Sequence, residues 1–189
     1  MPADWREEWF KEGATDYLTI ATLARNGLID EPLLFKRLEN VPRRYLIARH
    51  AQGLAMSVRD AGKDKQPNRQ LVYGGGSLAA LALDVELRKR SDDRVGLPQL
   101  LQAMHREFAS GKPYTLDDIA RLAGELTGTD FRPFLDSAVS STQWFDIRPA
   151  YAALGLRMDT FVEETYIARD PGAGARERAR FEAIFSPGR

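Results

Sequence analysis

Trp9-Phe10-Lys11-Glu12-Gly13-Ala14-Thr15-Asp16-Tyr17 is the most informative segment of this chain. It lies within a predicted helix over residues 5–25. Glu12 and Asp16 are four residues apart and therefore share one helical face, where two like charges are mildly unfavourable unless a cation offsets them. Gly13 lowers helix stability by about 1 kcal/mol relative to alanine. A glycine at this position indicates that another backbone approaches the helix closely.

The rest of the chain is predicted to be mostly helical, because apolar residues recur at helical spacing between caps and glycine stops. Residues 78–90 are apolar around the whole helix, which indicates a central, buried element. Residues 61–69 are predicted to form a surface loop. Residues 156–167 favour strand. Further helices are expected to start near residue 30 and to cover 45–60, 97–108, 115–126, 130–139 and 175–185.

The chain divides in this prediction into a helical body, residues 1–141, and a C-terminal extension, residues 142–189, packed on it. Basic and acidic residues balance at 27 each, so charge gives no reason to expect nucleic acid or an anionic membrane as partner. There is no cysteine, which excludes disulfides, thiolate nucleophiles and cysteine-based zinc sites. No apolar run approaches membrane-spanning length. The sequence does not indicate a cellular compartment.

The segment 9–17 resembles the part of glycyl-aminopeptidase-like gluzincin metallopeptidases that supplies the third zinc ligand. In that family, His-Glu-x-x-His on one helix provides two ligands and the general base, and a glutamate on the next helix completes the site. The resemblance implies that Glu12 is the zinc-binding carboxylate. It also implies that Asp16 accepts a hydrogen bond from a ligand histidine and orients it.

Two downstream segments extend the resemblance. Leu71-Val72-Tyr73-Gly74-Gly75-Gly76-Ser77-Leu78 is similar to the family's Val-Tyr-x-x-Gly segment, which implies that Tyr73 stabilises the oxyanion of the tetrahedral intermediate. Leu83-Asp84-Val85-Glu86-Leu87-Arg88 looks like its Leu-Asp-x-x-Leu-Arg helix. With shorter matches at 112–115 and 127–131, the resemblance covers residues 9–139. It implies a mostly α fold like the C-terminal helical subdomain of a thermolysin-like peptidase, with a short strand-and-helix extension.

The histidine pair of that family is absent from this sequence. His50 and His105 are the only histidines, neither belongs to a His-Glu-x-x-His motif, and both follow Glu12. The resemblance therefore implies zinc and a peptide substrate for a full-length parent, with no tightly bound zinc and no activity in this chain alone. We expect the face bearing Trp9, Glu12 and Asp16 to be open, or covered by a missing N-terminal half or a second copy.

Two other functions remain possible on the sequence. The chain could be a non-catalytic helical binding module instead of an excised part of a peptidase. Residues 115–124 also resemble the first helix and turn of helix-turn-helix repressors. Residues 125–130, which follow, are acidic and broken by a glycine, so a recognition helix is not apparent and DNA binding is the least favoured of the three.

Overall fold

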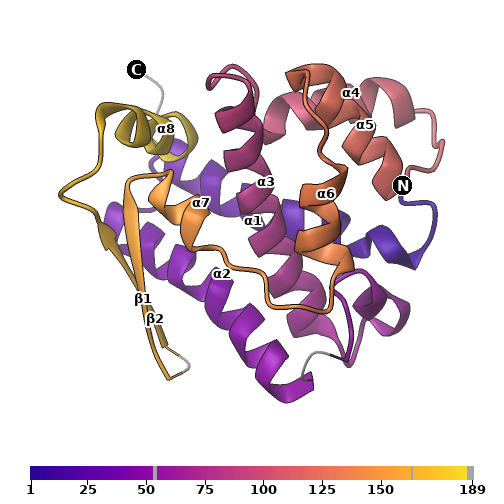
Figure 1. The fold of residues 1–189 in the computed structure, drawn as a ribbon, viewed down its shortest axis with the longest axis horizontal. Coiled ribbons are helices and arrows are strands. Elements are labelled where there is room, and N and C mark those ends of the chain that lie inside the picture. The colour runs from indigo at the N-terminus through magenta and orange to yellow at the C-terminus, as the bar shows by residue number, and fades with distance from the viewer. Residues whose placement is uncertain (53–54, 163, 187–189) are drawn as a thin grey trace.

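The computed structural model describes residues 1–52, 55–162 and 164–186, and within them the chain is mostly helical, as predicted (Figure 1). Short 3-10 segments at Trp5–Glu7 and Asp60–Asp64 and π-helical turns at Gln70–Gly75 and Asp136–Ser140 join the longer elements. The longer elements are α1 (Glu8–Arg25), α2 (Glu31–Gln52), α3 (Gly76–Arg90), α4 (Leu97–Phe108), α5 (Leu116–Thr127), α6 (Arg132–Leu135), α7 (Arg148–Ala152), β1 (Leu156–Phe161), β2 (Glu164–Arg169) and α8 (Ala175–Phe185).

Helix α3 is the centre of the fold. It contacts α1, α2, α4, α5 and α7, and residues 76–85 are all buried. A helix that is apolar on every side can lose its contact with water only when neighbours surround it. The prediction of a central, buried helix is confirmed.

Helices α1 and α3 cross at two glycines. A Cβ built on Gly13 would lie 2.1 Å from the carbonyl carbon of Gly76. A Cβ on Gly76 would lie 2.4 Å from the carbonyl oxygen of Trp9. Real atoms do not come this close, so only glycine permits the crossing. The expectation that another backbone approaches Gly13 is confirmed.

Two predictions between α1 and α3 need correction. Helix α2 is continuous from Glu31 to Gln52 with Pro42 inside it, so the helix predicted over 45–60 belongs to α2 and ends earlier than expected; residues 53 and 54 lie outside the described part. The loop predicted over 61–69 begins with the 3-10 segment Asp60–Asp64, in which Ala61 and Gly62 are buried. The segment is mostly polar, so its sequence did not indicate that these two small residues are buried.

The described residues after 141 contain a pair of strands and two helices. Strands β1 and β2 pair antiparallel, from Leu156 opposite Arg169 to Phe161 opposite Glu164. The predicted strand region therefore contains two strands, β1 and β2, and not one. Strand β2 contacts α2, and α8 contacts α1; Figure 1 shows the pair of strands running beside α2. The Tyr151 hydroxyl donates a hydrogen bond to the Leu38 carbonyl, at 2.9 Å.

Helix α5 matches the range predicted for it, 115–126, to within one residue at each end. The Thr115 and Asp118 side chains each cap the other's backbone N–H, and Gly128 ends the helix with φ of 75°. The helix predicted over 130–139 is observed as α6, Arg132–Leu135, continued directly by the π-helical turn Asp136–Ser140. Within the described ranges, no helix has both the length and the apolar character needed to cross a membrane.

Candidate functional site

Glu12 on α1 and Tyr73 on the π-helical turn before α3 come together in the fold. The Tyr73 hydroxyl and the Glu12 carboxylate lie close enough that each shifts the pKa of the other. Their meeting follows from the crossing of Gly13 and Gly76, since Glu12 precedes the first glycine and Tyr73 lies less than one turn before the second. The Glu12 side chain is 19% exposed, so it reaches the surface from a partly buried position.

The Glu12 carboxylate forms a salt bridge with a lysine, Lys65. Lys65 Nζ donates to Glu12 Oε1 at 3.0 Å and to Glu8 Oε2 at 2.8 Å. Lys11 Nζ lies further away, 3.6 Å from Glu12 Oε1. Lys65 therefore bridges two carboxylates that lie one helical turn apart, and its ammonium offsets the repulsion between them.

These contacts determine the charge state of the site. Burial raises the pKa of Glu12, but hydrogen bonds from Lys65 and Tyr73 outweigh burial, so its pKa is lower than usual. Burial, together with the hydrogen bond to Glu12, raises the pKa of Tyr73. The two carboxylates raise the pKa of Lys65. At neutral pH the site therefore holds an anionic Glu12, a cationic Lys65 and a protonated Tyr73.

Asp16 pairs with a different cation. Arg44 Nη1 on α2 lies 2.5 Å from Asp16 Oδ2. Glu12 and Asp16 share a helical face as predicted, but each has its own partner, and among the described residues no lysine or arginine pairs with both. A polar hollow of about 410 Å³ opens beside Tyr73 and includes Arg44 and Arg69 in its lining.

The expectation for Trp9 was wrong. Its side chain is completely buried by the chain itself, and its indole N–H donates to Glu7 Oε2 at 3.2 Å. Trp9 shares the core-facing stripe of α1 with Gly13 and Tyr17, whereas Glu12 and Asp16 lie on the neighbouring stripe. Only the carboxylate stripe is partly exposed, so Trp9 is not available to a second polypeptide.

The described residues do not fit a zinc site by themselves. No group of three or more His, Cys, Asp or Glu side chains in this part of the chain could hold a metal ion. His50 lies against Trp144, with ring centroids 6.2 Å apart, and His105 lines a groove beside α4. Zinc needs three or four well-placed ligands, and Glu12 is a single carboxylate.

Sequence reasoning missed Glu7, although it is among the most buried charged residues. It is 2% exposed and accepts hydrogen bonds from Arg59 Nη2 at 2.6 Å and from the backbone N–H of Leu116 at 3.1 Å. The second bond ties the start of α1 to the first turn of α5. No local pattern could have indicated it, since both partners are remote in sequence.

The Leu83–Arg88 motif proves to be structural. Asp84 is buried and accepts hydrogen bonds from the Tyr17 hydroxyl at 2.7 Å, Arg88 Nε at 3.0 Å and the backbone N–H of Leu97 at 2.9 Å. Asp84 thereby joins α1, α3 and the start of α4. Every polar contact of its carboxylate is internal, so it holds helices together and does not face a ligand.

No protein-family model matches the sequence, and no curated protein does. Among solved structures, the chain is similar to an aminopeptidase N family protein of Idiomarina loihiensis, with a TM-score of 0.71 and 22% sequence identity. The match covers 83% of this chain and 28% of that one. The chain therefore spans little more than a quarter of its structural neighbour, and it shares the helical fold of that part.

Proposed function

We propose that this chain is the helical part of an aminopeptidase-like catalytic unit, in which Glu12 and Tyr73 face the reaction site. The meeting of these two side chains carries the proposal. They come from separate elements, each shifts the pKa of the other, and Tyr73 lines a polar hollow. The fold shared with an aminopeptidase N family protein supports the same assignment.

Each residue has a distinct role in the proposal. Glu12, anionic at neutral pH, would contribute the carboxylate ligand of zinc, and the histidine ligands would come from another polypeptide segment. Tyr73 keeps its proton because its pKa is raised, so its hydroxyl can donate a hydrogen bond to the oxyanion formed from a peptide carbonyl. Asp16 would leave Arg44 and orient a ligand histidine.

One observation favours the alternative, a non-catalytic binding module. Lys65 already neutralises Glu12 and Glu8, so the carboxylate has a partner without any metal. In a working site Lys65 would have to release Glu12 before a metal could bind. In a binding module the ion pair would stay closed and simply hold the segment before α3 against α1.

The test uses the native product of the gene that encodes this chain, with whatever further residues it carries. Zinc content is measured by elemental analysis, and hydrolysis is followed with glycine and leucine p-nitroanilides. We expect Glu12→Gln to lose zinc and to lower activity by at least ~100-fold, since even residues that only support ligands cost about 10–100-fold. Tyr73→Phe should lower kcat and keep the zinc.

Glu8→Gln is the matched control. Glu8 lies one turn before Glu12 and contacts the same lysine, but the proposal gives it no role with metal. It should keep both zinc and activity. If the native product contains no zinc and hydrolyses neither substrate, the catalytic proposal is wrong and the binding module is supported. Equal losses in the two glutamine variants would show that the ion pair, and not a ligand, is what matters.

A further inference from the structure

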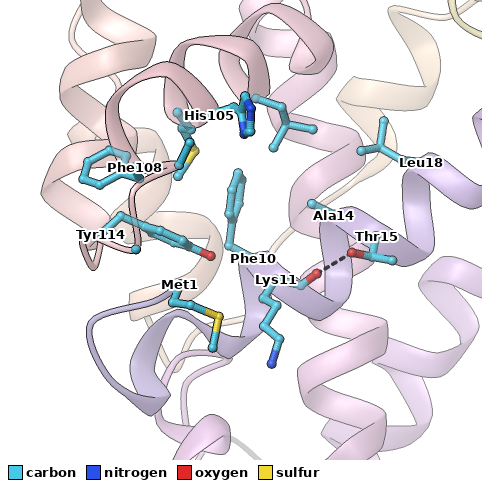
Figure 2. Close-up of a pocket in the computed structure, with 13 residues that line it drawn as sticks. Met1, Phe10, Lys11, Ala14, Thr15, Leu18, His105, Phe108 and Tyr114 are labelled. Atoms are coloured by element: carbon cyan, nitrogen blue, oxygen red, sulfur yellow. Dashed lines mark hydrogen bonds between the residues drawn. The ribbon is translucent and has the colours of Figure 1, made fainter.

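A second candidate site lies on a different face of α1. Figure 2 shows a groove between α1 and α4, closed at one side by the N-terminal segment and by the residues before α5. Its volume is about 460 Å³, within the ~300–1,000 Å³ typical of small-molecule sites. The lining residues are Met1, Phe10, Lys11, Ala14, Thr15, Leu18, Leu101, Met104, His105, Phe108, Ala109, Gly111 and Tyr114.

Packed aromatic rings form the floor of the groove. Tyr114 meets Phe10 edge to face at a centroid distance of 6.1 Å and Phe108 at 5.9 Å. Both phenylalanines and Met104 are buried. Because each ring is held by another, the apolar surface exists before any ligand arrives, which lowers the entropy cost of binding.

The polar side chains around this floor are those of Lys11, Thr15, His105 and Tyr114, and each of them can donate a hydrogen bond. No carboxylate is among the lining residues. Figure 2 places Lys11 and the Tyr114 hydroxyl on the Met1 side of the Phe10 ring, and His105 on the opposite side. The groove therefore has an apolar middle and a hydrogen-bond-donating end with one lysine, whose charge Glu8 and Glu12 partly offset.

The Tyr114 hydroxyl is free to bind a ligand. It lies at the Met1 side of the groove, where a ligand can reach it. Burial and the nearby charges of Glu7 and Glu8 raise its pKa to about 12, so it remains a donor at neutral pH. The Tyr114 side chain is mostly buried, and its hydroxyl can donate a hydrogen bond to an acceptor that enters the groove.

Lys11 can also turn toward the groove. Its ammonium lies 3.4 Å from Glu8 and 3.6 Å from Glu12, and its side chain is 43% exposed. Ion pairs this long and this exposed hold a side chain weakly. A carboxylate at the Met1 end would give Lys11 a closer partner beside the Tyr114 hydroxyl.

We propose that this groove binds a small amphipathic carboxylate, an aryl or alkyl acid. Its apolar body lies over Phe10 and Met104, and its carboxylate accepts hydrogen bonds from the Tyr114 hydroxyl and the Lys11 ammonium. The site lies beside the Glu12 and Tyr73 pair, which it meets through Lys11, and it needs no metal. An alcohol of the same skeleton binds less tightly because it leaves the lysine charge unused, and an amine is repelled by it.

The proposal is tested by titrating the chain with 4-phenylbutyrate, 4-phenylbutan-1-ol and 4-phenylbutylamine, followed by calorimetry and by backbone amide NMR shifts. We expect saturable binding of the acid, about tenfold tighter than the alcohol because charge-assisted hydrogen bonds are the stronger kind, and weakest binding of the amine. The shifts should map to Ala14 and His105. Equal affinity for acid and alcohol, or no saturable binding of the acid, overturns the proposal.

Variants locate the site. Tyr114→Phe and Lys11→Met should each reduce the preference for the acid over the alcohol and leave alcohol binding unchanged. Ala109 is exposed and lines the groove, so Ala109→Trp should block both ligands. Ser110 is exposed and does not line it, so Ser110→Trp is the matched control. If both tryptophan variants bind the acid as the parent chain does, the ligand lies elsewhere and the assignment is wrong.

Discussion

Gly13 of α1 and Gly76 of α3 touch backbone to backbone, with no room for a side chain on either residue. This contact places the carboxylate stripe of α1 beside the π-helical turn that leads into α3. Glu12 directly precedes Gly13 on α1, and Tyr73 lies in the turn before Gly76 of α3. The geometry of the candidate site is therefore fixed by packing in the core below it.

Gly13→Ala should destabilise the chain. In a helix without the crossing, alanine would stabilise by about 1 kcal/mol. Here its methyl group overlaps the backbone of Gly76, and overpacking of this kind costs about 1–3 kcal/mol. The free energy of unfolding in urea measures the change.

Gly124→Ala serves as the comparison for that variant. A Cβ on Gly124 of α5 meets one atom within 4 Å, the Thr129 carbonyl oxygen at 3.2 Å. Its effect should be clearly smaller than that of Gly13→Ala. Equal effects would mean that α1 can move away from α3 at little cost, and that the crossing does not hold Glu12 in place.

Asp84 and Tyr17 should prove energetically coupled. Asp84→Ala leaves Arg88 and two other donors unpaired in the core, and breaking a buried charge pair costs about 3–5 kcal/mol. Tyr17→Phe should cost about 1.5–3 kcal/mol, the range for a hydrogen bond to a charged group. The double variant should lose less than the sum of the two, because each removes the same bond.

Asp159→Ala is the control for this cycle. Asp159 is an exposed residue of β1, and surface substitutions usually change stability by less than ~0.5 kcal/mol. Unfolding free energies from urea titration would settle all of these values. Strict additivity of Asp84→Ala and Tyr17→Phe would contradict the shared hydrogen bond.

Lys65→Met should raise the pKa of Glu12. The variant removes a hydrogen bond and a positive charge that lower this pKa, and the effect of burial, which raises it, remains. Carboxyl carbon NMR titration of Glu12 measures the shift. Lys63→Met is the control, since Lys63 is an exposed lysine two residues away and takes no part in the pKa of Glu12.

The same contact predicts how stability depends on pH. Because the pKa of Glu12 is lower in the folded chain than its ordinary value of 4.5, ionised Glu12 stabilises the fold. This contribution is fully present above pH 4.5 and is lost as the pH falls through the lowered value. Lys65→Met should reduce that acid-dependent loss. An unchanged acid limb of the stability curve would show that Lys65 does not pair with Glu12 in solution.

The 189-residue chain alone should not hydrolyse aminoacyl p-nitroanilides, with or without added zinc. Its described residues offer no group of three ligands for a metal, and one carboxylate does not hold a catalytic zinc ion. Activity of purified chain that chelators abolish and zinc restores would prove this wrong. The experiment is distinct from the test on the native gene product, which supplies any further ligands.

Much of the helical architecture could be predicted from sequence because its signals are local. The capping box at Thr115, the stop at Gly128 and the apolar circumference of α3 each depend on residues within a few positions of one another. Glu12 and Asp16 could be placed on one face of α1 for the same reason. The close approach at Gly13 was also predictable. An interior glycine weakens a helix, so it is expected mainly where another backbone packs against that position.

Only the tertiary structure decided what these side chains meet. Lys65 binds Glu12, Arg44 binds Asp16, and Gly76 packs on Gly13, all across long separations in sequence. Burial of Trp9 and the groove in Figure 2 likewise depend on the crossing of whole helices. Helical spacing tells which residues share a face. The partner of that face depends on how the helices pack, and packing is a property of the whole chain.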